Sequence, residues 1–306
     1  MRNLSHIVVT HGVPDGFALL RAHTLHMPPS LTAFTREELA HLMSDADAIV
    51  ACGALDGDLI RSARHLKVIA NYGSGYDAVD IAAARECGVP VTNIPDITAE
   101  ATAELAIGLL LSVARRIGEM NLRLRRESPT ALFGMGREMG MTLRGKTLGV
   151  IGMGRIGSRV AEIARALGMN VIGMERGGDM DSILRQADAI TLHCPLNDQT
   201  RGLIGARELA LLKPGALLIN TARGPVVDHD ALADAILSGH IAGAGLDVFP
   251  DEPHVPQRLI ELERVVLTPH VGTNTAETRL AMAEACSRVI LDVFAGKRPE
   301  NIVNGL

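Results

Sequence analysis

Short apolar stretches rich in Val and Ile alternate with stretches of helical spacing along almost the whole chain. Because the short stretches are apolar throughout, they predict strands that are buried on both faces of a parallel sheet. Alternation of strands and helices predicts an α/β fold with right-handed crossovers. Clear helical spacing is seen at Thr35–Met43, Ser158–Leu167 and Asp230–Leu237. The predicted strands are His6–Thr10, Ala48–Ala51, Leu66–Asn71, Pro90–Asn93, Thr147–Ile151, Asn170–Met174, Ala189–His193, Ala216–Asn220, Ala244–Val248 and Arg264–Thr268.

These strands are more than one open sheet usually carries, so the pattern predicts two domains, as does the length of 306 residues. A nearly all-apolar helix is predicted over Ala99–Met120, with Thr98 as its N-cap and Glu100 in its first turn. Such a helix is expected to be buried between layers or domains.

A Gly- and Arg-rich stretch with little periodicity follows at Leu122–Gly145. It is either a surface loop or an arm that packs on another subunit. Its cluster of Arg123, Arg125 and Arg126 favours a solvated face over a binding patch.

Composition narrows the function classes. The net charge of −5 provides no broad positive field, which argues against a nucleic-acid partner. The four cysteines are scattered without metal-ligand spacing, so we expect reduced thiols, no metal and a cytoplasmic protein. The first residues lack the apolar core of a signal peptide. No apolar run approaches a membrane span, the longest candidate being Leu105–Val113, so we expect no membrane partner.

A predicted strand, Thr147–Ile151, runs directly into Gly-Met-Gly-Arg-Ile-Gly at residues 152–157, and a predicted helix follows. In this context Gly152 permits the tight turn, Gly154 lets a pyrophosphate approach the backbone, and Gly157 lets helix and strand pack closely. The amides that open the helix then face the phosphates. Dinucleotide binding is favoured over a purely structural turn.

The next strand ends at Glu175, 23 positions after Gly152. A carboxylate at this place accepts hydrogen bonds from the ribose hydroxyls of NAD and repels the 2′-phosphate of NADP. The neighbouring Arg176 has the opposite preference, because a guanidinium pairs with that phosphate. NAD is favoured, and NADP is not excluded.

With these motifs the chain resembles the D-isomer-specific 2-hydroxyacid dehydrogenases, and the resemblance covers nearly the whole chain. The segments that carry it are Leu66–Asp77, the long helix beginning near Thr98, the glycine turn, Ile219–Pro225, Gly245–Pro253 and Leu267–Gly272.

The resemblance implies two Rossmann-like lobes with parallel sheets and an active site in the cleft between them. A flavodoxin-like substrate domain would comprise residues 1–97 and 279–306, and a dinucleotide-binding Rossmann domain residues 98–278. The hinges would lie near Ile97 and at Thr275–Arg279, with Ala281–Phe294 as the returning helix. The family is usually dimeric, which makes Leu122–Gly145 a candidate dimer arm.

The same resemblance assigns catalytic roles to Arg223, Glu252 and His270. Arg223 would bind the carboxylate and carbonyl of a 2-oxo acid, to which its planar fork is suited. His270 would exchange the proton, since imidazole titrates near neutral pH. Glu252, and not its neighbour Asp251, would bind the other ring nitrogen, fix the tautomer and stabilise the imidazolium. Glu252 also argues against formate oxidation, because some formate-oxidising relatives carry Gln there.

Further contacts follow from the resemblance. Backbone amides of Ser74 and Gly75 would bind the substrate carboxylate, beside Arg223 and His270. Asp247 would orient the nicotinamide, and Cys194 is expected to pack and not to act as a nucleophile. The full set of expected cofactor contacts is Gly152, Gly154, Arg155, Ile156, Gly157, Glu175, Arg176, His193, Cys194, Pro195, Thr221, Ala222, Asp247 and Gly272.

The resulting hypothesis is an NAD(P)H-dependent reductase of small 2-oxo acids such as glyoxylate or hydroxypyruvate, giving D-2-hydroxy acids. Two alternatives stay open, namely D-3-phosphoglycerate dehydrogenase and an NADH-sensing scaffold similar to the C-terminal-binding corepressors. Many relatives carry Trp before the glycine turn, whereas this chain has none. Phe133 or Met135 is the candidate substitute, which leaves the substrate's side-chain preference open.

Overall fold

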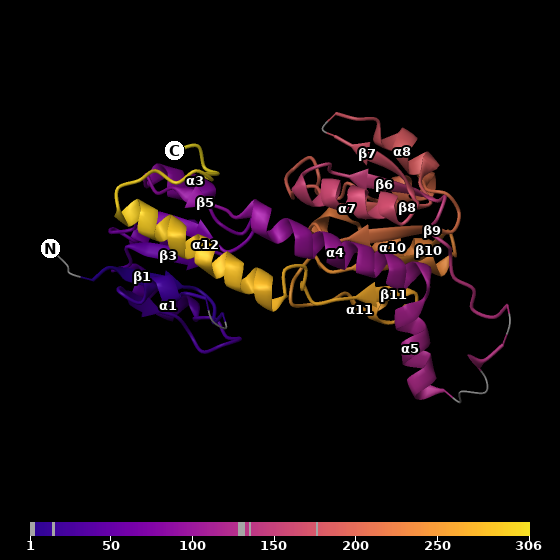
Figure 1. Cartoon of the computed structure of the whole chain (residues 1–306), viewed down its shortest axis with the longest axis horizontal. Helices are drawn as coiled ribbons and strands as arrows, with labels where there is room; N and C mark the ends of the chain where they lie inside the picture. Colours follow the sequence, from indigo (N-terminus) through magenta and orange to yellow (C-terminus); the bar gives the residue numbers. More distant parts are fainter. Residues whose placement is uncertain (1–3, 14–15, 128–131, 135, 176) are drawn as a thin grey trace. The chain divides into compact units, whose positions relative to one another are not determined.

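The computed structural model describes residues 4–13, 16–127, 132–134, 136–175 and 177–306 (Figure 1). The chain divides into two compact units. The first unit is Met1–Thr98 with Thr273–Leu306, and the second unit is Ala99–Gly272. The chain therefore returns to the first unit at Thr273, before the returning helix, whereas the sequence analysis expected the return at residue 279.

The first unit contains one sheet of five parallel strands in the order β2-β1-β3-β4-β5. The sequence analysis missed β2, because three residues are too few to show a pattern. Helix α12 packs its apolar side into the core of this unit. The strands are β1 (His6–Val9), β2 (Thr24–His26), β3 (Ala48–Ala51), β4 (Val68–Asn71) and β5 (Val91–Thr92). The helices are η1 (Ala18–Leu20), α1 (Arg36–Met43), α2 (Gly57–Ser62), α3 (Ile81–Glu86) and α12 (Ala276–Phe294).

The second unit contains a sheet of six parallel strands in the order β11-β10-β9-β8-β6-β7. Two apolar clusters form its core, and they share the strands of this sheet. The strands are β6 (Thr147–Ile151), β7 (Asn170–Met174), β8 (Ala189–Leu192), β9 (Ala216–Asn220), β10 (Ile241–Leu246) and β11 (Val265–Leu267). The remaining helices are α4 (Pro95–Ala114), which begins in the first unit, α5 (Ile117–Arg126), α7 (Arg155–Ala166), α8 (Met180–Gln186), α9 (Ala206–Leu211), η2 (Gly224–Val226), α10 (His229–Leu237) and α11 (Gln257–Ile260).

Every strand predicted from the sequence overlaps an observed strand, and both sheets are parallel, so the α/β prediction is confirmed. In the second sheet the strand order reverses at β6, which pairs with β7 on one side and β8 on the other. A reversal of this kind opens a crevice at the carboxyl ends of the strands, where α/β sheets bind ligands.

The long apolar helix differs from its prediction at both ends. It begins at Pro95, so Thr98 lies inside it and donates its hydroxyl to the Pro95 carbonyl. It ends at Ala114, because Arg116 adopts a left-handed conformation (φ 55°) and starts the separate helix α5. Helix α5 takes up the beginning of Leu122–Gly145, which was expected to lack regular structure.

Helix α4 is long and apolar enough, by length and composition alone, to span a membrane, although Asp96, Glu100 and Glu104 interrupt its apolar runs. The helix nevertheless contributes buried residues to the core of the second unit, among them Ala103, Leu110 and Val113. A buried core helix satisfies the same criteria of length and composition.

Candidate active site

The carboxyl ends of all six strands in the second sheet carry residues that were predicted to bind cofactor or substrate. This convergence follows from the parallel order, since every strand then ends at the same edge of the sheet. The residues that follow β6, β7, β8, β9, β10 and β11 are, in turn, Gly152, Glu175, His193, Arg223, Asp247 and His270.

The glycine turn after β6 requires two of its glycines for steric reasons. Gly152 has φ +101°, and a Cβ atom there would lie 2.8 Å from the backbone of His193 and Cys194. A Cβ atom on Gly157 would lie 2.0 Å from the Gly152 carbonyl oxygen. Gly154 is different, because a Cβ atom there would meet nothing within 4 Å. Its bare backbone therefore faces open space that a ligand can approach.

Helix α7 starts directly from this turn, with Arg155 and Ile156 in its first turn. Its N-cap is Gly154, which has no side chain to bind the first amides. The amide groups and the helix dipole make such an N-terminus favourable for phosphate. The strand, the sterically required turn and the helix start together fit a dinucleotide.

Glu175 directly follows β7 and is exposed. Its carbonyl oxygen accepts a hydrogen bond from the amide of Gly178, which closes the turn after the strand. Arg176, its predicted competitor, lies outside the described residues.

The loop after β8 places His193 between two hydroxyl groups. Its Nε2 lies 2.8 Å from the Thr191 hydroxyl and its Nδ1 lies 3.5 Å from the Thr221 hydroxyl. Burial lowers the pKa of His193 to about 3, so the ring is neutral at physiological pH. Burial also raises the pKa of the Cys194 thiol, as expected for a packing residue and not for a nucleophile. Pro195 is exposed, and its carbonyl oxygen accepts from the Thr200 hydroxyl.

The loop carrying Arg223 is shaped by Asn220, which the sequence analysis did not single out. The fully buried Asn220 side chain donates to the Arg223 carbonyl (2.9 Å) and accepts from the Ala222 amide (3.0 Å). A Cβ atom on Gly224 would lie 2.0 Å from the backbone of Phe249, so this loop and the Phe249 loop touch backbone to backbone. A polar residue that ends an apolar strand was the signal for Asn220.

His270 and Glu252 form a direct pair, with 2.7 Å between the His270 Nδ1 and Glu252 Oε2 atoms. The other Glu252 oxygen accepts from the amide of Phe249 at 3.0 Å. Burial raises the Glu252 pKa, but the hydrogen bonds from His270 and Phe249 and the charges of His270 and Arg223 outweigh it, so the pKa lies below its ordinary value. Glu252 is therefore ionised at neutral pH and accepts a hydrogen bond from Nδ1 of His270, and Nε2 lies on the other side of the ring.

Asp247 organises the turn on which His270 sits. Its Oδ1 accepts from the Thr268 hydroxyl (2.6 Å) and the Val271 amide (2.8 Å), and its Oδ2 accepts from the Gly272 amide (2.9 Å). These bonds support His270 in a left-handed conformation (φ 52°), which is unfavourable for a residue with a Cβ atom. Burial raises the pKa of Asp247 although these bonds oppose it. A lone pair on Oδ2 is left for a further donor.

Ser74 and Gly75 lie in the first unit, in the loop after β4. The Asn93 side chain donates to the Ser74 carbonyl (2.8 Å), and the Asn71 side chain donates to the carbonyls of Gly73 (3.0 Å) and Gly75 (2.9 Å). These bonds fix the conformation of the loop that carries Ser74 and Gly75. Asn71 ends β4 and Asn93 directly follows β5, and neither was predicted as a supporting residue.

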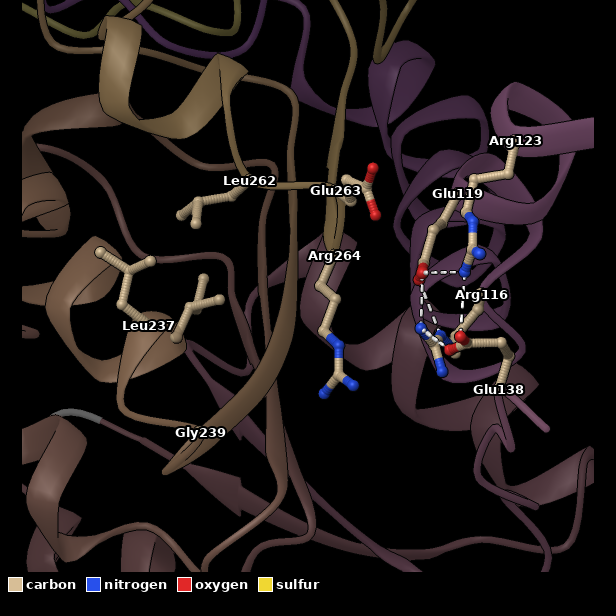
Figure 2. Close-up of a pocket in the computed structure, with 10 residues that line it drawn as sticks. Arg116, Glu119, Arg123, Glu138, Leu237, Gly239, Leu262, Glu263 and Arg264 are labelled. Carbon is tan, nitrogen blue, oxygen red and sulfur yellow. Dashed lines mark hydrogen bonds and ion pairs between the residues drawn. The ribbon is translucent and has the colours of Figure 1, made fainter. Parts of the chain in front are cut away.

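A cavity of about 490 Å³ lies elsewhere in the second unit, beside α5 (Figure 2). Figure 2 shows a network of Arg116, Glu119, Arg123 and Glu138 on one side, with Arg264 pointing toward the open space. None of the predicted cofactor or substrate residues lines it. This cavity is therefore separate from the edge of the sheet described above.

Comparison with known proteins identifies the family. Residues 107–272 match the model of the D-isomer specific 2-hydroxyacid dehydrogenase, NAD binding domain. The chain is also 42% identical to a glyoxylate reductase from Thermococcus litoralis, over 97% of this chain and 96% of that protein. The chain belongs to the D-isomer specific 2-hydroxyacid dehydrogenases.

Two other relatives bear on substrate and cofactor. This dehydrogenase is 39% identical to a D-3-phosphoglycerate dehydrogenase from Methanocaldococcus jannaschii, over 89% of this chain but only 54% of that protein. It also resembles the structure of an NADPH-dependent glyoxylate/hydroxypyruvate reductase from Sinorhizobium meliloti in complex with NADP and malonate. That match has a TM-score of 0.84 at 31% identity and covers 98% of this chain and 96% of the other. The protein is thus an NAD(P)-dependent oxidoreductase that interconverts small 2-oxo and 2-hydroxy acids, and the family prediction is confirmed.

Proposed function

We propose that this dehydrogenase reduces glyoxylate or hydroxypyruvate to the corresponding 2-hydroxy acid, of D configuration where the product is chiral. The single observation that carries the proposal is the 2.7 Å contact between His270 and Glu252 on a turn held by Asp247. A histidine oriented by a carboxylate is the proton donor that carbonyl reduction needs. The glyoxylate reductase among its relatives supports the choice of substrate.

In this proposal Arg223 binds the carboxylate and the carbonyl oxygen of the substrate through its planar guanidinium. NAD(P)H supplies the hydride when bound. The Nε2 of His270 donates its proton to the oxygen of the former carbonyl, and the ionised Glu252 stabilises the imidazolium before that transfer. Amides of Ser74 and Gly75 bind the substrate carboxylate, and Asp247 accepts a hydrogen bond from the nicotinamide carboxamide. In this proposal the first unit, which contains Ser74 and Gly75, is the substrate domain, and the second unit is the dinucleotide-binding domain.

We further propose that NADH is preferred to NADPH. The exposed carboxylate of Glu175 at the end of β7 would accept hydrogen bonds from ribose hydroxyls and repel a 2′-phosphate. The NADPH dependence of the relative from Sinorhizobium meliloti makes this choice a necessary part of the test.

We also propose a cytoplasmic homodimer in which α5 and the loop after it form the arm. Ile117 and Leu124 lie seven positions apart on one face of α5 and are 56% and 49% exposed. In the loop, Phe133 and Met139 are each 77% exposed. Exposed apolar side chains gathered on one segment are typical of a protein interface. Met135 lies outside the described residues.

The test is the decrease in absorbance at 340 nm with NADH or NADPH and glyoxylate, hydroxypyruvate, pyruvate or 3-phosphohydroxypyruvate. We expect the highest kcat/KM with NADH and one of the first two acids. A preference for 3-phosphohydroxypyruvate would replace the proposal with D-3-phosphoglycerate dehydrogenase. Tight NADH binding without turnover of any acid would favour a scaffold that senses NADH.

A further inference from the structure

Arg279 is held in an unusual way in the first unit. It lies in the first turn of α12, half-buried, with its guanidinium carbon 5.8 Å from the ring centre of Tyr72. The Tyr72 hydroxyl donates to the backbone carbonyl of the same arginine at 2.8 Å. Tyr72 thus supports both the backbone and the side chain of Arg279.

The positive charge of Arg279 is not neutralised by a carboxylate anywhere in the described part of the chain. The N-terminal end of a helix is also an unfavourable place for a cation, because the helix dipole is positive there. The neighbouring Cys52 and Tyr72 are neutral, since burial raises the pKa of each to about 12. A half-buried cation that pairs with no carboxylate among the described residues, placed where the helix dipole opposes it, is suited to bind a ligand.

Arg279 also lies at the ligand-binding edge of the first sheet. Tyr72 directly follows β4 and is two positions before Ser74, and Cys52 directly follows β3. These strands are parallel neighbours, so their carboxyl ends lie at the same edge. The guanidinium is therefore anchored to the same loop that presents the amides of Ser74 and Gly75.

We propose that Arg279 is a substrate-binding residue that donates a hydrogen bond to an oxygen on carbon 3 of the 2-oxo acid. The proposed function already assigns the substrate carboxylate to Arg223 and to the amides of Ser74 and Gly75, which leaves Arg279 for a different oxygen. The substrate class is then a 2-oxo acid with an oxygen-bearing carbon 3, as in hydroxypyruvate. This inference rests on the proposed function.

The test compares hydroxypyruvate with pyruvate, which differ by one oxygen on carbon 3, and with glyoxylate, which has no carbon 3. For wild type we expect kcat/KM to be at least about tenfold higher with hydroxypyruvate than with pyruvate, as one hydrogen bond to a charged group provides. In Arg279→Gln this ratio should fall toward one, mainly through KM. The loss with hydroxypyruvate should exceed the loss with glyoxylate by at least about tenfold.

Arg288→Gln is the matched control, because Arg288 lies on the same helix, is exposed and pairs with Glu284. Its ratio of hydroxypyruvate to pyruvate should equal that of wild type. Tyr72→Phe keeps the aromatic ring under the guanidinium and should lower the ratio less than Tyr72→Leu does.

Three results would overturn the inference. They are a wild type that does not distinguish the two three-carbon acids, an Arg279→Gln variant that loses activity equally with all three acids, and a variant ratio equal to that of wild type. Tight NADH binding by Arg279→Gln would show that the second unit is intact. Failure of wild type to reduce any of the acids would contradict the proposed function itself.

Discussion

The pairing of His270 with Glu252 leads to a prediction about proton transfer. The His270 ring, whose Nδ1 binds Glu252, is the proposed proton donor. Removing the ring therefore removes that donor, whereas the glycine turn that is expected to bind NADH is unchanged. We expect His270→Ala to lower kcat by at least about 100-fold, as general acids typically contribute, with NADH affinity within about threefold of wild type. Stopped-flow reduction and NADH fluorescence titration measure the two quantities.

His254 offers a control close in sequence, because its side chain is 81% exposed and pairs only weakly with Asp251. His254→Ala should leave kcat unchanged. A His270→Ala variant with near-normal kcat would refute the assignment of the proton donor.

His193 predicts a pH dependence of stability. Its pKa in the folded chain is about 3 because of burial, against about 6.5 for an exposed histidine. Between these values the unfolded chain binds more protons, so the free energy of unfolding falls as pH drops below about 6.5. One proton contributes at most about 1.4 kcal/mol per pH unit. In urea unfolding, His193→Gln should lose less stability than wild type between about pH 7 and pH 5; equal slopes would show that the ring is protonated in the folded chain.

At the scale of the element, the glycine turn contains two kinds of glycine. Gly157 is required because a side chain cannot fit there, whereas Gly154 faces space that a ligand can occupy. A methyl group on Gly157 would lie 2.0 Å from a backbone oxygen, whereas one on Gly154 would meet open space. We expect Gly157→Ala to lower the free energy of unfolding by about 1–3 kcal/mol. Gly154→Ala should change it by less than about 0.5 kcal/mol but weaken NADH binding by at least tenfold, an estimate of about 1.4 kcal/mol. Chemical denaturation and fluorescence titration measure both variants, and unchanged NADH affinity in Gly154→Ala would exclude a phosphate at this turn.

Ion pairs between arginines and glutamates stabilise helix α5 and the loop that follows it. Arg116 donates to Glu119 within the helix, and Arg123 pairs with Glu127 and with Glu138 of the following loop. These pairs fold the loop back onto the helix, so the arm is stabilised by its own residues. Glu119 and Glu138 both pair with Arg116, the residue in the left-handed conformation at the break between α4 and α5.

At the scale of the whole molecule, the proposed arm of α5 and the loop after it leads to a prediction about the oligomeric state. A charge on its exposed apolar face should prevent a second copy from packing there. We expect Leu124→Glu to convert a dimer into a monomer of unchanged secondary structure, as measured by light scattering coupled to gel filtration. Leu19→Glu, at a 46% exposed apolar residue of the first unit, should leave the mass unchanged. A wild type that is monomeric at micromolar concentration would contradict the proposed arm.

The strands and the glycine turn were predictable from the sequence because their causes are local. Apolar runs specify buried parallel strands, and Gly152 and Gly157 lie where a side chain cannot fit. Short or conformational features escaped prediction: β2 has three residues, and the break between α4 and α5 is a left-handed backbone conformation at Arg116, a residue that is not glycine.

The sequence by itself determined the α/β class, the order of the elements and the motifs at the strand ends. Only the tertiary structure decided which side chains meet. Asn220 shapes the Arg223 loop, Asp247 supports the His270 turn and Tyr72 carries Arg279 over a separation of 207 positions in the chain. The physical reason is that a hydrogen bond or a cation–π contact requires two groups within a few ångströms, and that proximity depends on how distant strands and helices pack together.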